Sequence, residues 1–195
     1  FKFFTEFLKQ RKSYIHLHEV IISDNPRKFF VDLDAKRLNK DLCDAHKNRI
    51  INIIKQLFAK TYSKLIGDIN LVIVDSSGQV EDYFKYSINI IIDGYAFEDY
   101  AEFRWFGEQV CDAYYTSFDA IQGFLDENFF KRKYVDSYIS ARLPECTKGG
   151  EARYKLVTSN HEYEDAIISN VKTCERLKLK SKINRDEYVE KYKKQ

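Results

Sequence analysis

The chain has 195 residues and a mass of 23.2 kDa, which is enough for one domain with its own hydrophobic core. Hydrophobic residues make up 44% of the sequence and charged residues 32%, a balance that excludes an intrinsically disordered chain. No apolar run approaches the roughly 18 residues that a membrane-spanning helix needs, so we expect no membrane partner. Methionine is absent even at position 1, and we therefore expect the sequence to be part of a longer protein.

The cysteines are predicted to be free thiols. They form no Cys-x-x-Cys pair, and no histidine stands at zinc-ligand spacing beside one. The four are Cys43, Cys111, Cys146 and Cys174. This pattern is typical of a reducing compartment, so we expect an intracellular location.

Charge is distributed unevenly along the chain, although the overall net charge is only +2. Residues 1–64 carry a net charge of +7, residues 131–155 carry +4 and residues 176–194 carry +5, whereas residues 98–127 carry −7. A small overall charge therefore does not exclude a basic face that binds a polyanion such as a nucleic acid. Ordinary solvated helix faces are the alternative explanation, and the charge counts alone favour that alternative.

The hydrophobic pattern predicts helices and pairs of strands in alternation. The predicted helices span residues 1–12, 35–65, 97–125, 161–176 and 184–194. The predicted strands span residues 14–22, 27–33, 69–75, 83–92, 134–142 and 152–158. This order indicates an α+β (α/β) fold with a mixed sheet and helices packed on it. We expect residues 1–175 to form the core and residues 176–195 to form a basic helical connector or appendage.

An aromatic stripe supports the long helix predicted at residues 97–125. Phe103, Phe106, Phe118 and Leu125 recur at helical spacing within it. Such stripes are usually part of a hydrophobic core, so we assign these side chains to packing.

Two carboxylates lie at the C-terminal end of the strand predicted at residues 27–33, one within it and one just after it. Side chains alternate in a strand, so Asp32 and Asp34 would share the face opposite Val31 and Leu33. At about 7 Å apart along that face, the two carboxylates could hold hard divalent cations. The alternative is a solvated strand end that leads into a helix with Asp34 as its N-cap.

A polar strip is predicted on the strand at residues 83–92. Lys85, Ser87 and Asn89 would share one of its faces, and a lysine, a hydroxyl and an amide in one row could contact phosphates. An antiparallel strand with one wet face explains the same alternation.

A third candidate region follows, at residues 134–150. Asp136 and Arg142 would share a face of an extended strand, and Lys148 lies in the loop after it. Arg142 and Lys148 could grip phosphates, although the spacing of a P-loop is missing. An ordinary basic hairpin is the alternative.

Together, these elements resemble the archaeo-eukaryotic primase superfamily, and most closely the branch of PrimPol and the primase-helicases of large DNA viruses. That family carries an hhhDhD/E motif on a first strand, here residues 29–34, and a Ser-x-His motif on a later strand, here residues 87–89. An hD motif follows, here residues 135–136, and then an arginine-to-lysine stretch, here residues 142–148. The resemblance spans roughly residues 14–158.

The resemblance implies an RRM-like primase core that performs template-directed, two-metal nucleotidyl transfer to make primers in DNA replication. Asp32, Asp34 and Asp136 would be the catalytic residues and would bind two Mg²⁺ or Mn²⁺ ions. The triphosphate would be positioned by Lys85, Ser87, Asn89, Arg142 and Lys148. The implied partners are a single-stranded DNA template, nucleoside triphosphates and a helicase, in the nucleus, the cytoplasm or a viral replication site.

One position departs from the family pattern. Asn89 stands where the family has a histidine that contacts the nucleotide's phosphates, and asparagine can donate a hydrogen bond but carries no charge. His16 and His18 share one face of the strand predicted at residues 14–22, and both a place in the cleft and a structural role stay open for them. A catalytically weakened, primase-like nucleic-acid-binding module and a metal-dependent nuclease are therefore alternative functions.

Overall fold

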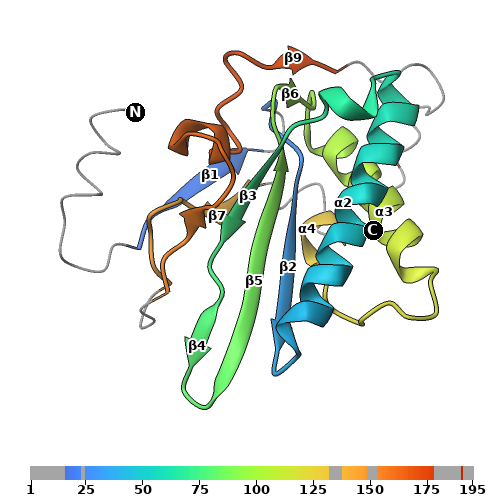
Figure 1. Cartoon of the computed structure of the whole chain (residues 1–195). Coiled ribbons are helices and arrows are strands. Elements are labelled where there is room, and N and C mark those ends of the chain that lie inside the picture. The colour runs from blue at the N-terminus through green and yellow to red at the C-terminus, as the bar shows by residue number, and fades with distance from the viewer. Residues whose placement is uncertain (1–15, 23–24, 132–137, 149–152, 178–189, 191–195) are drawn as a thin grey trace.

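A computed structural model describes residues 16–22, 25–131, 138–148, 153–177 and residue 190 (Figure 1). Its main sheet is antiparallel throughout and has the order β2 (Phe30–Lys36), β5 (Tyr83–Ile92), β3 (Leu71–Asp75) and β8 (Leu156–Val157), with β4 (Gly78–Val80) also paired to β5. Two smaller pairs lie apart from it. These are β1 (His18–Ile22) with β7 (Tyr138–Arg142), which are antiparallel, and β6 (Tyr95–Ala96) with β9 (Glu175–Arg176), which are parallel.

The helices are α2 (Lys40–Tyr62), α3 (Tyr100–Tyr115) and the short α4 (Asn128–Lys131), together with the 3-10 turns η1 (Ile66–Asp68) and η2 (Tyr163–Ala166). Helices α2 and α3 lie side by side against one face of the main sheet (Figure 1). The predicted α+β fold is confirmed, but the predicted mixed sheet is wrong for the main sheet, because all of its described strand pairs are antiparallel and the parallel pair β6–β9 is separate from it. No helix in the described residues is both long and apolar enough to cross a membrane.

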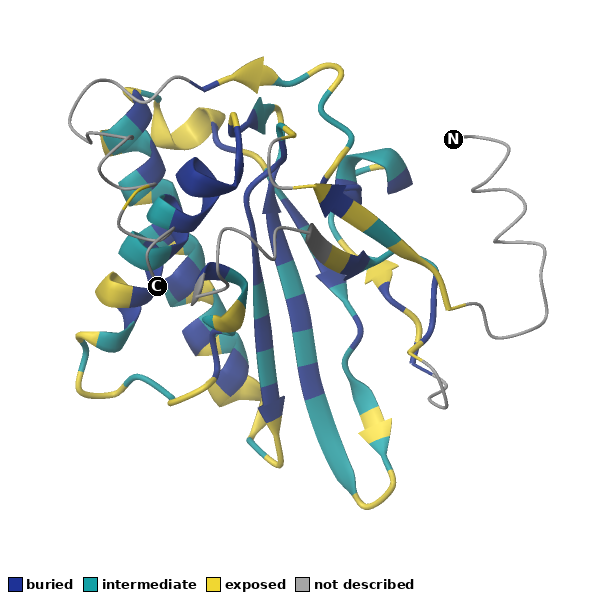
Figure 2. Ribbon diagram, turned by 180° about the vertical axis from the view of Figure 1, so that it is seen from behind, coloured by how far each residue is buried: buried dark blue, intermediate teal, exposed yellow. Residues whose placement is uncertain are grey.

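Alternation along β2 and β5 separates the two faces of the sheet. Val31 and Leu33 are fully buried in the core, whereas Asp32 and Asp34, which alternate with them along the strand, are only partly buried. The same alternation of buried and half-buried residues is visible along β5 (Figure 2). The helices therefore cover an apolar face, and a polar face remains on the other side.

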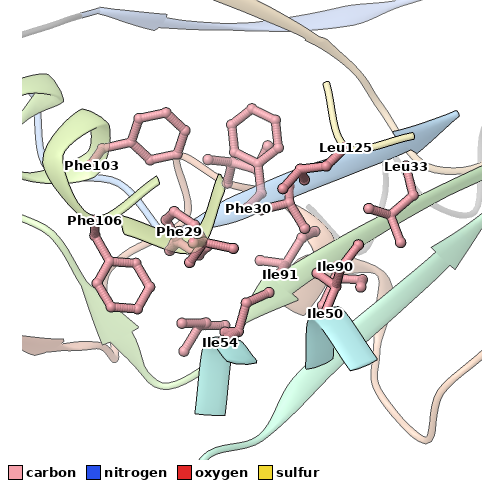
Figure 3. Packing of buried hydrophobic residues seen from close by; sticks show 14 of the residues in the cluster. Phe29, Phe30, Leu33, Ile50, Ile54, Ile90, Ile91, Phe103, Phe106 and Leu125 are labelled. Atoms are coloured by element: carbon pink, nitrogen blue, oxygen red, sulfur yellow. The ribbon is translucent and has the colours of Figure 1, made fainter. Parts of the chain in front are cut away.

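Helix α2 supplies one side of the core. It begins after Asn39, whose side chain accepts hydrogen bonds from the backbone N–H groups of Asp41 and Leu42, and it ends at Ser63, which has a left-handed φ of 54°. Its buried residues follow three- and four-residue steps and are Cys43, His46, Ile50, Ile54, Phe58 and Tyr62. Figure 3 shows the packing of this layer, with Ile50 near Ile90 and Ile54 near Ile91 of β5.

Helix α3 supplies the other side of the core and depends on one close approach. Gly107 lies on its buried face, and a Cβ atom built there would stand 2.2 Å from the ring of Phe130 in α4. The Phe130 ring also contacts Phe29 and Phe103, at centroid distances of 6.1 and 5.3 Å. Glycine at this position therefore lets an aromatic layer close over α3.

The helix predicted at residues 97–125 is too long, because α3 ends at Tyr115. Phe118, which was assigned to the core, is fully exposed, while Leu125 is buried as predicted. The chain after α3 runs instead along the outer edge of β2, where Asp34 N–H donates to Phe124 O at 2.9 Å and Asp126 N–H donates to Asp32 O at 2.9 Å. A helix could not offer these backbone groups to the otherwise open strand edge.

The helix predicted at residues 161–176 is also wrong. The 3-10 turn η2 and the short strand β9 form there instead, and Glu162 and Asp165 cap η2 reciprocally. The carbonyls of Asp165 and Ile168 accept hydrogen bonds from the side chain and backbone of Lys28, at 2.8 and 3.0 Å. These backbone groups therefore bind another segment instead of continuing a helix.

Other boundaries shift less. The helix predicted at residues 35–65 begins at Lys40, because β2 continues to Lys36, and Asn39 rather than Asp34 is its N-cap. Residues 83–92 form a strand as predicted. The helix predicted at residues 1–12 lies outside the described residues, as does nearly all of that at residues 184–194.

Strand β1 is fastened to the rest of the molecule by Glu19. Its carboxylate accepts hydrogen bonds from Ile168 N at 3.0 Å, Ser169 N at 2.9 Å and Ser169 Oγ at 2.8 Å. The β1–β7 ribbon is thereby held against the segment that follows η2.

The start of the predicted connector packs against the core. Arg176 pairs with Ala96 in the β6–β9 sheet, and Leu177 is buried and donates its backbone N–H to Ala96 O at 3.0 Å. The four cysteines are free thiols, as predicted.

The close approach at Gly107 leads to a stability prediction. Gly107→Ala should lower the free energy of unfolding by about 1–3 kcal/mol, because the new methyl group must displace the buried Phe130 ring. Gly67→Ala is the matched control, since a Cβ atom at Gly67 meets no atom within 4 Å. Urea denaturation of both variants measures the difference, and equal stabilities would contradict the packing described for α3.

Candidate active site

The polar face of the main sheet forms one wall of a cavity of about 720 Å³. The β1–β7 ribbon and the loops after β7 form the opposite wall. Six of the eight residues predicted for the site line this cavity, namely Asp32, Asp34, Lys85, Ser87, Arg142 and Lys148. Asn89 lines an adjoining cavity of about 150 Å³, and Asp136 lies outside the described residues.

The register of β2 against β5 places the predicted polar residues opposite one another. Asp32 faces Asn89 and Asp34 faces Ser87 in directly paired positions. Lys85 Nζ lies 3.1 Å from Asp34 Oδ1, so this lysine already neutralises a carboxylate in the protein without ligands. Lys85 is therefore positioned to hold Asp34 as well as to meet a phosphate.

A chain of hydrogen bonds links the two walls. Arg142 donates to Ser76 Oγ at 3.0 Å, and Ser76 Oγ donates to Ser87 Oγ at 3.1 Å. Ser76 is buried just after β3, and its carbonyl accepts a hydrogen bond from Arg153 at 2.6 Å. Ser76 thus fixes two guanidinium groups beside the predicted phosphate-contacting strip.

Lys155 is a buried cation beside the carboxylates. It lines the smaller cavity with Asp32, and its Nζ donates to the backbone carbonyl of Arg142 at 2.6 Å. Burial lowers the pKa of Lys155 to about 8, against the opposing effect of the Asp32 charge. The ribbon is therefore joined to the segment before β8 by a hydrogen bond from a buried amine next to the site.

Asp32 lies where negative charge is unfavourable. Burial first, and then the neighbouring carboxylates of Asp34 and Asp126, raise the pKa of Asp32 from 3.8 to about 6, although Lys155 opposes the shift. Asp126 reaches this position because its backbone is bonded to the edge of β2. A bound divalent cation would relieve this accumulation of negative charge.

The chemistry of these donors fits a hard divalent cation. Asp32 and Asp34 present carboxylate oxygens on one face, which Mg²⁺ and Mn²⁺ prefer. Among the described residues, however, no group of three or more His, Cys, Asp or Glu side chains could hold a metal ion. The two aspartates therefore provide only part of a coordination shell, and the third predicted ligand, Asp136, falls outside the described range.

His16 and His18 both line the larger cavity. Their Nε2 atoms are 3.0 Å apart, and His18 Nδ1 is 2.9 Å from Ser140 Oγ of β7. Partial burial and the positive groups His16, Arg142 and Lys155 lower the pKa of His18. Both histidines therefore lie at the cavity and not in the hydrophobic core.

Several residues of the site could not be found by sequence reasoning. Asp126, Arg153 and Lys155 lie in segments whose predicted elements gave no reason to single them out, and Ser76 lies just outside the strand predicted at residues 69–75. The charge count of residues 131–155 was the signal available for Arg153 and Lys155. For Asp126 the prediction of a continuous helix pointed away from the site.

Comparison with known proteins gives one partial similarity. The chain is 28% identical over 95 residues to an uncharacterized putative helicase, R8, of Acanthamoeba polyphaga mimivirus. The aligned region covers 46% of this chain and 9% of the mimivirus protein, so the chain corresponds to a small part of that protein. No known family model matches the sequence.

The raised pKa of Asp32 leads to a pH prediction. A carboxylate whose pKa is higher in the folded state favours folding below its unfolded pKa, and this contribution is lost as pH rises through the folded pKa. In EDTA, ionisation of Asp32 should therefore lower the free energy of unfolding as the pH rises from about 4 to about 7. The decrease should be no more than about 3 kcal/mol.

Asp32→Asn should remove this loss. The variant should unfold at a higher temperature than the wild type at pH 7, and the difference should shrink towards pH 4, where the wild-type carboxyl group is neutral too. Thermal melts across this pH range provide the measurement. A difference that grew towards low pH would show that the Asp32 carboxylate is stabilising.

Proposed function

We propose that this chain is the catalytic domain of a DNA primase or primase-polymerase, which extends a strand by template-directed, two-metal nucleotidyl transfer. The observation that carries the proposal is the cavity in which Asp32 and Asp34 face basic side chains from the β1–β7 ribbon and its loops. The order of these residues along the chain is also that of the archaeo-eukaryotic primase superfamily, which the sequence resembles.

The carboxylate wall supplies the reaction centre in this proposal. Asp32 and Asp34, with Asp136, would hold Mg²⁺ or Mn²⁺, and the ions would supply charge neutralisation for the transferred phosphate and the leaving pyrophosphate. Lys85 holds Asp34 in place through their 3.1 Å ion pair. The backbone bond from Asp126 to Asp32 O fixes the edge of β2, so the carboxylates keep their spacing while substrate binds.

The basic wall binds the polyphosphate in this proposal. Arg142 offers a planar fork that matches phosphate oxygens, and Lys148 adds an exposed point charge at the cavity mouth. Ser87 and Asn89 add uncharged hydrogen-bonding groups on β5. Arg153, whose guanidinium is held by the Ser76 carbonyl, gives the same wall another positive charge for the template backbone.

Similarity to a putative viral helicase supports a place in nucleic-acid replication. A primase acts where a helicase exposes single-stranded DNA, so a helicase as a neighbouring domain or partner accords with a match to a small part of that protein. The substrates would be nucleoside triphosphates and a single-stranded DNA template.

Loss of both carboxylates tests the reaction centre. The double variant Asp32→Asn, Asp34→Asn should abolish nucleotide incorporation on a primed DNA template with Mn²⁺, because both carboxylates of β2 that are proposed to bind the ions are removed. Mn²⁺ should also raise the melting temperature of the wild type and not that of the double variant. Asp82→Asn is the control, since Asp82 is an exposed carboxylate in the turn before β5.

Three results would count against the proposal. Normal incorporation by the double variant would remove the aspartates from the reaction centre. Cleavage of DNA by the wild type without incorporation would favour a metal-dependent nuclease, and DNA binding without either reaction would favour a primase-like binding module.

The role of Arg142 can be tested separately from DNA binding. Arg142→Ala should raise KM for the nucleotide about ten- to a hundredfold, because a charge-assisted contact to phosphate is lost. Arg142→Lys should restore only part of the activity, since the planar fork is missing. Arg37→Ala is the control, because Arg37 pairs with Asp82 on the exposed surface.

DNA affinity measured at several salt concentrations on the same variants decides between the two possible ligands. An unchanged KM with a flatter salt dependence of DNA binding would assign Arg142 to the template backbone instead.

A further inference from the structure

Two histidines from β1 and the residues before it form a paired group at the cavity wall. The 3.0 Å separation of the Nε2 atoms of His16 and His18 requires one ring to donate and the other to accept. Ser140 Oγ, at 2.9 Å from His18 Nδ1, is a hydroxyl that can donate to that nitrogen or accept from it, so these contacts allow either tautomer of His18. His16 and Ser140 together hold the His18 ring at the cavity wall.

This pair lies within a concentration of positive charge. His18 and Arg142 are directly paired across β1 and β7, and Lys155 donates to the backbone carbonyl of Arg142 at 2.6 Å. Like charges in directly paired strand positions are destabilising, so a proton on His18 beside Arg142 is unfavourable in the protein without ligands. Partial burial first, and then the charges of His16, Arg142 and Lys155, lower the pKa of His18. An anion bound between these groups would convert the repulsion into attraction.

A phosphate oxygen suits a state of the pair in which both rings carry a proton on Nε2. When both rings carry a proton on Nε2, neither can accept from the other, and their mutual hydrogen bond is lost. A phosphate oxygen only accepts hydrogen bonds, so two Nε2–H groups can converge on it. His16 and His18 are both exposed at the cavity, so a ligand can reach them without rearrangement of the core.

We propose that His18, together with His16, binds the polyphosphate of the incoming nucleoside triphosphate beside Arg142. This assignment rests on the proposed function, and it adds a binding element from β1 to those on β5 and β7. The nucleotide is favoured over the template as the ligand because the two imidazoles share one cavity with Asp32 and Asp34, where the triphosphate must lie for transfer.

Calorimetric titration of the full chain with three ligands tests the inference. The ligands are a nucleoside, its monophosphate and its triphosphate, each with Mg²⁺. His18→Gln and His16→Gln should weaken triphosphate binding about ten- to a hundredfold and leave binding of the nucleoside unchanged, because only phosphate contacts are removed. His161→Gln is the matched control, since His161 lies outside the cavity and pairs with Ser159 Oγ at 2.9 Å.

The outcomes separate this inference from the proposed function. Unchanged triphosphate affinity in both variants would overturn the inference, as would an equal loss of affinity for nucleoside and triphosphate. Weakened triphosphate binding in the variants, with no incorporation by the wild type, would support the inference and count against the proposed function. An effect of His161→Gln equal to that of His18→Gln would also overturn the assignment.

Discussion

Antiparallel pairing of β2 with β5 is the constraint on which both the core and the candidate site depend. Because side chains alternate along each strand, the register that buries Val31 and Leu33 under the helices also turns Asp32 and Asp34 to the cavity. A slip of one residue would place the carboxylates among the apolar side chains of the core. The hydrophobic effect that drives folding therefore also fixes the position of the charged groups.

Short-range patterns explain why much of this could be predicted. The polar and apolar residues of β5 alternate from Phe84 to Ile90, and the boundaries of this strand follow directly from the sequence. The faces of β2 and the buried stripe of α2 follow from periods of two and of three to four residues. Two aspartates on one strand and a row of polar residues on its neighbour could be recognised for the same reason.

Long-range contacts explain why the rest could not be predicted. The chain after Tyr115 has a helical period, yet it satisfies the backbone groups at the edge of β2, and this competition is decided by tertiary structure. The segment after η2 likewise gives its carbonyls to Lys28. Asp126 and Lys155 reach the site only through such contacts, so no local pattern identifies them.

The two walls of the cavity are built by separate pieces of structure. In the described part of the chain, the β1–β7 ribbon shares no strand with the main sheet, and Glu19 and Lys155 are two of its fastenings to the body. Substitutions in the ribbon can therefore reshape the basic wall while the carboxylates stay on a sheet that the core holds rigid. This division allows the ligand preference of the basic wall to change by substitution in the ribbon, without a change in the hydrophobic core that supports the main sheet.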